Sequence, residues 1–520
     1  MSLLLLIFFR SASGFSILTF LKPVISTYFA CSSMCFSTIF LKYRKAFLNL
    51  KIWFSFLQDL ATYITVVRLN SSLKGRERGT AFLNKVARPK ARENVDILIV
   101  NAKELLTLDN PEAGPRTGSQ MRELGIVRDG ALAIREGRIV GVGTTIEVQR
   151  RFRAGYVINA QGKLVLPGFV DPHTHLVFAG SREDEFQRRV EGSSNMQITD
   201  SCGVLATVRQ TRRARVEALV ELGLERLDTM LGHGTTTVEA KSGYGLTTSD
   251  ELKILEATKR LNQLHSVNVV STLMGAYAVP SEYCRNSNEY VDLVVGEMIP
   301  KVAAKGLAEF CDVFCERGIF SLEQAKRVLV NGTAHGLRPK VHADQAAKLG
   351  GAEVAADVGA VSAEHLIFTS TQGVRALAAK GVVAVLLPAF AFSMMAGKYA
   401  DARMMIDNGV PVALGTGFDA CCWMENQQLV MAMACYFMHM TPAEAITAVT
   451  INAAYAVNRA GEVGSLEVGK RADVLVLGVP NHKFLGYRFG VNLVDKVIKN
   501  GRLVLDRDRQ DEPILLSKTE

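Results

Sequence analysis

The central part of the chain alternates short apolar runs with longer segments whose apolar residues recur at helical spacing. The short runs are rich in β-branched residues, as buried strands are. We expect strands at 234–239, 267–274, 310–314, 340–343, 382–387 and 410–414, and helices at 215–231, 250–264, 322–331 and 442–456. Such alternation indicates a parallel sheet, and the number of units predicts an α/β fold of the (β/α)8, TIM-like barrel type over residues 168–460. The chemistry of such a barrel lies at the carboxyl ends of its strands.

The segments on either side of this region carry short strands separated by tight turns. Before the barrel, strands are expected at 96–100, 130–134, 137–143 and 163–166. After it, the run 464–477 predicts two short strands across a turn, and 494–498 is expected to pair with 502–505. We therefore expect one small β-sandwich domain built from residues 93–167 and 461–510, followed by a tail at 511–520.

Residues 1–92 differ sharply from everything that follows. They are apolar and hold fourteen basic against two acidic side chains, a net charge of +12, whereas the whole 520-residue chain carries +9. The uncharged stretch 23–41 approaches transmembrane length, although serine and threonine interrupt it. Three interpretations of this leader stay open: a membrane anchor, a targeting peptide, and upstream sequence outside the working protein. We expect it to lie outside the folded core.

Composition excludes several classes of protein. Hydrophobic residues make up 48% and charged residues 21% of the chain, which is typical of a globular enzyme and not of a disordered protein. Basic residues form no stripe interleaved with stacking aromatics, so no nucleic-acid contact is expected. The nine cysteines form no paired CxxC motif. Cys311 and Cys315 are expected to be buried free thiols, and a reducing compartment, the cytoplasm, follows.

The strongest chemical signal is the motif PGFVDPHTH at residues 167–175. His173 and His175 are two residues apart on an expected strand, so both imidazoles project to one face and can reach one metal ion. The alternative is a pair of core histidines with satisfied hydrogen bonds. The flanking Pro-Gly and Asp-Pro pairs favour metal ligation.

Two further histidines follow strand-like runs. His342 comes after residues 340–341, and His365 comes after 362–364. Four histidines thus fall where a barrel presents its active face. The other five are expected to be structural or exposed: His233, His265, His335, His439 and His482.

Six segments in order along the chain carry a family resemblance: LPGFVDPHTHLVFAGSREDEF, TTTVEAKSGYGL, KVHAD, AVLLP, INAAYA and GSLEVGKRADVLVL. Together they resemble the amidohydrolase superfamily and, within it, the imidazolonepropionase family. The similarity covers about residues 95–505. GSLEVGKRAD is shared by many amidohydrolases, whereas GSREDEF and EAKSGYGL are much more particular to this family.

The resemblance implies a hydrolase that opens the ring of 4-imidazolone-5-propanoate to give N-formimidoyl-L-glutamate in histidine degradation. It also implies one divalent metal ion, zinc or iron, held by His173, His175 and His342 with an aspartate from the last strand. The chemistry agrees, because a divalent ion lowers the pKa of a bound water from ~15.7 to about 7. A nearby carboxylate then takes up and returns the proton.

Other residues of the matching segments are assigned to the substrate. The propionate needs a cation with fork geometry, and Arg182 fits that role. The alternative for Arg182 is a surface ion pair with Glu183 or Asp184. Tyr244 is expected to hydrogen-bond the substrate from a loop, and His365 to contact the ring or its developing charge.

The chain departs from the family pattern at positions that fall on the expected site. Gly417 occupies the position of the expected aspartate ligand, Gln345 replaces a glutamate that faces the substrate, and Tyr277 replaces a substrate-contacting histidine. Asp419 begins a loop of altered sequence, 419–422. We expect His365, Gln345 and Asp419 to serve catalysis, and Tyr277, Gln345 and Asp419 to help bind the substrate.

Three functions are compatible with these residues: an imidazolonepropionase, another cyclic-amide hydrolase or deaminase on the same scaffold, and a metal-holding relative without turnover. Arg182 and Tyr244 favour the first, whereas Gly417 and Gln345 favour the third. The expected partner is a small-molecule substrate, with no nucleic acid and no stable membrane role apart from the leader. A homodimer is one option for the assembly.

Overall fold

The computed structural model describes residues 91–109, 114–192 and 203–509. The interpretations of the leader concern residues outside these ranges, and so does the expected tail at 511–520. Among the helices of the described ranges, none is both long enough and apolar enough to cross a bilayer.

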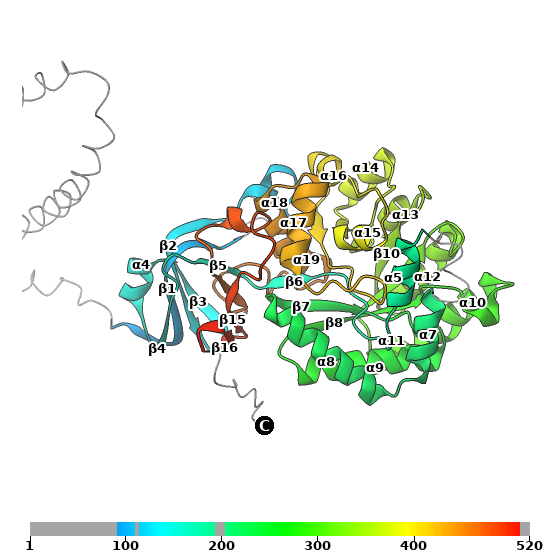
Figure 1. The fold of residues 1–520 in the computed structure, drawn as a ribbon, viewed down its shortest axis with the longest axis horizontal. Helices are drawn as coiled ribbons and strands as arrows, with labels where there is room; N and C mark the ends of the chain where they lie inside the picture. The colour runs from blue at the N-terminus through cyan, green and yellow to red at the C-terminus, as the bar shows by residue number, and fades with distance from the viewer. Residues whose placement is uncertain (1–90, 110–113, 193–202, 510–520) are drawn as a thin grey trace, which may run out of the picture. The chain divides into compact units, whose positions relative to one another are not determined.

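Eight strands form one parallel sheet in which each strand pairs with the next along the chain. Their bounds are β6 (Phe169–Asp171), β7 (Thr235–Lys241), β8 (Asn268–Ala276), β9 (Phe310–Cys315), β10 (Arg338–Ala343), β11 (Ser362–His365), β12 (Val383–Leu386) and β13 (Val412–Leu414). The first and last strands meet just beyond their ends, where His175 N–H donates to the carbonyl of Phe418 at 2.7 Å. The expected (β/α)8, TIM-like barrel is thereby confirmed (Figure 1).

Helices connect these strands, and three of the four expected ones are confirmed as α8, α9 and α12. The helices of this part of the chain are α5 (Glu183–Val190), α7 (Val204–Arg213), α8 (Val216–Gly232), α9 (Thr248–Leu264), α10 (Ser287–Leu293), α11 (Ile299–Ala304), α12 (Leu322–Ala334), α13 (Gly351–Asp357), α14 (Thr371–Lys380), α15 (Pro388–Ser393), α16 (Ala402–Asp407), α17 (Gln427–Met438), α18 (Pro442–Ala448) and α19 (Ile451–Ala456). The single helix expected at 442–456 is wrong: Thr450, at φ −124° and ψ −98°, leaves helical geometry and separates α18 from α19.

The short strands from both ends of the described chain share a second sheet, in the order β16-β15-β14-β5-β1-β2-β3 with β4 also paired to β1. Their bounds, with the one α-helix among them, are β1 (Glu93–Leu106), β2 (Ile126–Arg135), β3 (Arg138–Thr144), α4 (Thr145–Arg151), β4 (Phe152–Asn159), β5 (Leu164–Pro167), β14 (Val474–Leu477), β15 (Val494–Lys499) and β16 (Arg502–Asp506). The two chain ends meet where β14 pairs antiparallel with β5, so strands drawn in blue and red belong to one sheet (Figure 1).

One strand expected in this sheet does not form. The run 464–477 contributes only β14, because residues 464–470 follow turns and irregular backbone instead of pairing. Gly464 and Gly469 both have positive φ, +90° and +95°, a conformation typical of turns and not of a strand.

The barrel strands are buried along nearly their whole length, as parallel strands covered by helices usually are. Cys311 and Cys315 on β9 are buried free thiols, as expected. The same strands also carry fully buried charged side chains. We call this set the buried charge cluster; its members are Glu239, Lys241, Asp312, Lys340 and Glu364.

Candidate metal centre

The chain leaves β6 through Asp171-Pro-His173-Thr-His175, which places both histidines at the carboxyl end of the first barrel strand. The side chain of His342, on β10, faces the same point. The ring centre of His173 lies 4.6 Å from that of His342 and 5.9 Å from that of His175, and the rings of His175 and His342 are 5.8 Å apart. All three residues are at most 2% exposed. The structure thus brings His342 next to His173 and His175, although His342 lies 169 positions after His173 in the sequence.

His365 joins these rings from the end of β11. Its ring centre is 5.3 Å from that of His173 and 5.2 Å from that of His342. The backbone of His365 and of Leu366 is left-handed, with φ of +69° and +56°. Successive non-glycine residues in this region are strained, and such strain gathers at functional sites. The potential ligand atoms of His173, His342 and His365 lie within 4.8 Å of one another.

Three of the four imidazoles have an acceptor beside Nδ1. Glu364 Oε2 lies 2.8 Å from Nδ1 of His173, and Asp312 Oδ2 lies 3.0 Å from Nδ1 of His342. His175 Nδ1 is 3.1 Å from the carbonyl of Ser242.

An oxygen beside Nδ1 favours a proton on that nitrogen and a lone pair on Nε2, which is how metal-binding histidines are usually oriented. Within the described residues, Nδ1 of His173, His342 and His365 makes no hydrogen bond of good geometry, but a carboxylate oxygen lies 2.8 Å from Nδ1 of His173 and 3.0 Å from that of His342. His173, His175 and His342 therefore resemble oriented metal ligands more closely than His365 does.

Burial keeps the imidazoles of His173, His175 and His365 neutral. It is the largest effect on each, and it lowers the pKa of His175 to about 4 and the pKa values of His173 and His365 well below the usual range. A neutral imidazole is the form that binds a metal ion. The donor set and its charge state both fit a divalent cation.

The buried charge cluster lies directly against the histidines. Lys241 Nζ is 2.7 Å from Asp312 Oδ2, 2.9 Å from Glu364 Oε2 and 3.0 Å from Glu239 Oε2. Although burial disfavours its charge, these three carboxylates raise the pKa of Lys241, so it stays an ammonium ion. Lys340 adds a second cation, 2.9 Å from Glu239 Oε1.

Sequence reasoning missed this cluster. The sequence does hold a signal for it. Within apolar strands, Glu239 and Lys241 are two positions apart, and so are Lys340 and His342, so the side chains of each pair share one face of their strand.

Asp171 was also missed. Its carboxylate accepts hydrogen bonds from Thr416 Oγ1 at 2.5 Å and from the backbone N–H groups of Thr416 and His173 at 3.1 and 3.4 Å. Burial raises the pKa of Asp171 to about 7, against the effect of those donors. Asp171 thus connects the end of β6 with the chain leaving β13 and fixes the backbone that carries His173.

Arg182 is buried beside this site and pairs with neither residue of the expected surface ion pair. Its guanidinium is 2.6 Å from Glu185 Oε2, one turn along α5, so the Glu183 and Asp184 alternative is wrong. Burial disfavours the charge of Arg182, but neighbours that include Tyr244 and Asp419 raise its pKa. Arg182 therefore stays charged close to the residues that the sequence assigned to the substrate.

Tyr244 and Tyr277 flank His175. Their ring centres lie 5.6 and 4.9 Å from that of His175, and 5.6 Å from each other. Tyr244 lies in the loop after β7 and Tyr277 immediately after β8. The two tyrosine side chains thus form an aromatic wall beside His175.

Gly417 contributes no ligand, and its backbone is left-handed with φ of +65°. Its N–H donates to the carbonyl of His173 at 3.1 Å. A Cβ at this position would meet Phe390 Cβ at 3.2 Å and Leu387 Cβ at 3.6 Å. An aspartate there would need a small shift of Phe390, although aspartate tolerates this backbone region better than most residues do.

Asp419 is buried two residues further on. Its Oδ1 accepts from the N–H groups of Cys421 and Cys422 at 2.7 and 2.8 Å, so this oxygen holds the turn 419–422. The charge of Asp419 acts on the pKa values of His175 and both tyrosines. Its carboxylate therefore lies near the centre while also stabilising its own loop.

Gln345 follows β10 and is half-buried. The hydrogen bonds that fix this turn are backbone ones: N–H of Gln345 and of Ala346 donate to Glu316 Oε2 at 2.9 and 2.8 Å. The neighbouring Asp344 accepts from the loop that leads into α13. Gln345 thus lies at a rigid strand exit, two residues beyond the end of β10.

Four of the five remaining histidines have local partners. His233 and His335 end α8 and α12, where Nδ1 of each bonds a carbonyl of the last turn. His265 pairs with Asp228 and His482 with Glu104.

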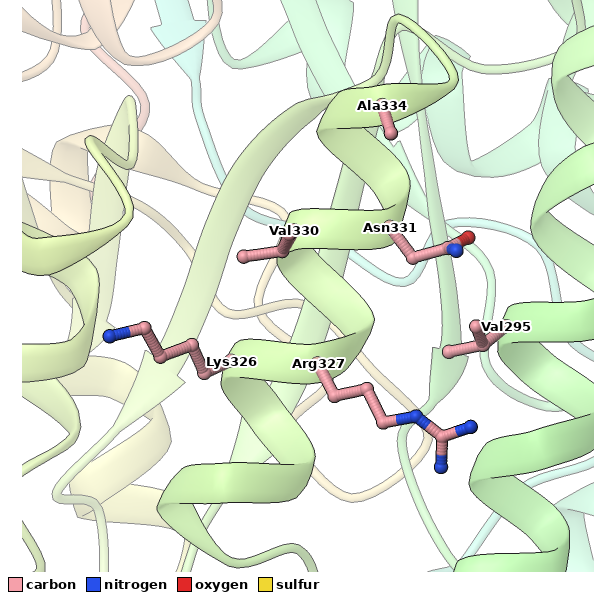
Figure 2. A pocket seen from close by; sticks show the side chains of 6 residues that line it. All are labelled: Val295, Lys326, Arg327, Val330, Asn331 and Ala334. Atoms are coloured by element: carbon pink, nitrogen blue, oxygen red, sulfur yellow. The ribbon is translucent and has the colours of Figure 1, made fainter.

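A cavity of about 390 Å³ lies elsewhere, along α12 (Figure 2). It is lined by Val295, Lys326, Arg327, Val330, Asn331 and Ala334. None of the candidate site residues lines it.

Comparison with known proteins agrees with this geometry. The amidohydrolase family matches residues 164–504, which include every member of the histidine cluster. Two solved structures share the fold at 18% identity: an adenosine deaminase from Xanthomonas campestris with bound zinc (TM-score 0.59, covering 80% of this chain and 94% of that one) and a variant of an atrazine chlorohydrolase from Arthrobacter aurescens complexed with zinc (TM-score 0.61, 81% and 97%). The chain belongs to the amidohydrolase family, and it is a hydrolase whose centre takes a divalent metal.

Closer relatives narrow the class. The imidazolonepropionase of Alkaliphilus metalliredigens is 48% identical over 80% of this chain and 99% of its own length. That of Geobacillus kaustophilus is 50% identical over 79% and 98%. Within the amidohydrolases, the chain is therefore an imidazolonepropionase-like enzyme.

Proposed function

We propose that this enzyme hydrolyses the five-membered ring of 4-imidazolone-5-propanoate to N-formimidoyl-L-glutamate. The observation that carries the proposal is the convergence of four buried imidazoles at the carboxyl end of the barrel, with a buried arginine beside them. The relatives bearing the name imidazolonepropionase support the same substrate.

One divalent ion, zinc or iron, is assigned to His173, His175 and His342. A carboxylate or carbonyl oxygen lies within 3.1 Å of Nδ1 in each of these three residues, which supports this choice over a set that includes His365. A divalent ion in such a site supplies a nucleophilic water at neutral pH.

The residues around the metal ligands bind and orient the substrate. Arg182 pairs with the propionate, since its guanidinium is buried and remains charged. Tyr244 and Tyr277 pack beside the ring, and Gln345 offers an amide at the exit of β10. These contacts would hold the ring carbonyl of the substrate beside His175 and away from bulk water.

Proton transfer is assigned to His365 and Asp419. His365 is neutral, so its ring has a lone pair that can accept a proton, and Oδ2 of Asp419 accepts a long hydrogen bond from Sγ of Cys421, at 3.5 Å, whereas Oδ1 accepts two short ones from backbone N–H groups. Gly417 marks the position of the absent aspartate. We therefore expect turnover below that of a site with a carboxylate at 417, because a positioned acid–base group typically contributes ~10²–10⁴ in rate.

The test is direct turnover. Purified full-length protein, loaded with zinc or with iron, is incubated with 4-imidazolone-5-propanoate, and N-formimidoyl-L-glutamate is quantified by mass spectrometry. Metal-dependent formation of this product supports the proposal. A metal-loaded protein that binds the substrate but forms no N-formimidoyl-L-glutamate would contradict the proposal and favour a metal-holding relative without turnover.

Assembly and compartment extend the proposal. An aromatic patch on α17 and the segment after η6 (His482–Phe484) supports a homodimer, with Tyr436, Phe437, Tyr487 and Phe489 each about half exposed or more. The cysteines of the described residues are free thiols, which supports a reducing, cytoplasmic location. Light scattering of the purified protein would decide between monomer and dimer.

A further inference from the structure

Lys241 ends β7 with its side chain fully buried. Its ammonium group contacts three carboxylates, those of Asp312, Glu364 and Glu239, at 2.7 to 3.0 Å. An ammonium ion surrounded by buried carboxylate oxygens occupies the kind of environment that otherwise holds a metal cation.

Two of the three oxygen atoms that contact Lys241 also contact the histidines. Asp312 Oδ2 lies 3.0 Å from His342 Nδ1, and Glu364 Oε2 lies 3.3 Å from the same nitrogen. The potential ligand atoms of Asp312, His342 and Glu364 lie within 4.8 Å of one another.

These ligand atoms are also short of hydrogen bonds. Within the described residues, Glu364 Oε2 and both ring nitrogens of His342 make none of good geometry. These three side chains would therefore form a second cation site, which shares His342 with the first, if Lys241 were absent.

Charge supports the same conclusion. The buried charge cluster contains two lysines and three carboxylates, a net charge of −1. Without Lys241 the net charge would be −2 in an interior where unpaired charge is strongly unfavourable. A divalent cation in the vacated volume would restore neutrality.

We propose that Lys241 is a built-in cation that fills a second cation site, formed by Asp312, His342 and Glu364, and so limits the centre to one metal ion. The inference rests on the proposed function, because it assumes that His173, His175 and His342 hold the first ion. Lys241 is a positioning residue in this account, since it acts through the carboxylates that contact His173 and His342.

The test replaces Lys241 in the full-length chain by methionine, which has a similar shape and no charge. Protein is stripped with a chelator, saturated with Zn²⁺, freed of excess ion and analysed for metal. We expect one equivalent in the parent and two in Lys241→Met. The stripped variant should also melt below the parent, and Zn²⁺ should raise its melting temperature by more than it raises that of the parent.

Two control variants separate a specific site from a general loss of charge. Lys340→Met removes the same charge from the same cluster, but Lys340 contacts Oε1 of Glu239 and Oε1 of Glu364 and not the oxygens that face His342. The Lys340→Met protein should therefore still bind one equivalent of Zn²⁺. Lys241→Met combined with Asp312→Asn returns the net charge to −1 but removes a ligand, and it should also bind one.

Several results would overturn the inference. One is a folded Lys241→Met protein with a single equivalent. Another is a Lys340→Met protein with two. A third is a Lys241→Met protein that fails to fold even when produced with Zn²⁺, because the cation should replace the ammonium group.

The outcomes also separate this inference from the proposed function. If the parent binds one ion and Lys241→Met also binds one, the role of Lys241 is wrong and the first metal site stands. If the parent binds none and Lys241→Met binds one, the first site is wrong and the second stands. If neither protein binds Zn²⁺, both are wrong.

Discussion

The two sides of the metal centre are built differently. At the ends of β6 and β10, buried imidazoles have a carboxylate or carbonyl oxygen beside Nδ1, as Glu364 on β11 lies 2.8 Å from Nδ1 of His173. At the exit of β13, Gly417 has a left-handed backbone and no side chain, and Asp419 uses one of its oxygens to hold its own turn. We therefore expect metal binding to depend on the histidine side and efficient turnover to depend on both sides.

The largest expected effect comes from returning a carboxylate to the altered side. Gly417→Asp should tighten metal binding and raise kcat, by up to ~10²–10⁴-fold if the group is well positioned. Adding Gln345→Glu should increase the gain, because residues that act as a unit are not additive. Steady-state kinetics and metal titration check both effects.

Gly417→Asn is the matched control, since it has the same shape and the same strained backbone without the charge. It should give no gain. Equal rates for the aspartate and asparagine variants, or a parent that already works at ordinary enzyme rates, would show that the site uses another route, and Asp419 would be the next residue to change.

The histidine side can be examined by pH in metal-free protein. The pKa of His175 is about 4 when folded, against about 6.5 in an unfolded chain. Above pH 6.5 neither state binds the proton, so this residue has no effect. As the pH falls from 6.5 to 4, the unfolded chain takes up a proton that the folded chain does not, and stability falls by up to about 3 kcal/mol.

His175→Gln should lack this loss. Urea unfolding of both proteins at pH 7.5 and pH 4.5 should show the parent losing more stability than the variant. An identical loss in the two proteins would mean that His175 is not held neutral by burial.

The proposed binding of the substrate propionate is tested through Arg182. Arg182→Met should lower kcat/KM by roughly 10–100-fold, mainly through KM, because a charge-assisted hydrogen bond contributes about 1.5–3 kcal/mol. Arg189→Met is the control, because Arg189 pairs with the same Glu185 at 2.5 Å. Similar losses in both variants would assign Arg182 to holding α5 and not to the propionate.

Removal of the leader, the residues before Arg92, is expected to have the smallest effect on stability and metal content. A chain that begins at Arg92 should keep the melting temperature and metal content of the full-length protein, within the roughly 0.5 kcal/mol typical of surface changes. Thermal unfolding of both proteins measures this. A shortened protein that aggregates or melts much lower would place the leader in the core.

The sequence predicted the barrel because strand and helix periodicities are local, and it predicted the pairing of His173 with His175 because alternate strand residues share a face. It did not reveal the buried charge cluster. Lys241 and Asp312 are 71 positions apart, and a lone charge in an apolar strand looks the same whether it points outward or into a barrel. Only the closed sheet shows that these charges meet.

The side-chain partner of Arg182 was missed for a similar reason. Glu183, Asp184 and Glu185 are adjacent in sequence, and the helical turn of α5 decides which of them faces Arg182. The break at Thr450 likewise depends on packing, since residues 442–456 have suitable helix formers on both sides of it.

The assignment of the metal ligands is tested most directly by comparing His175→Gln with His365→Gln in a metal-affinity titration. We expect His175→Gln to weaken metal binding by at least ~100-fold, because the substitution removes a metal ligand and not only a residue that orients one. His365→Gln should bind metal like the parent and lose turnover. The reverse result, with metal binding lost in His365→Gln and kept in His175→Gln, would contradict the assignment of His173, His175 and His342 as the metal site.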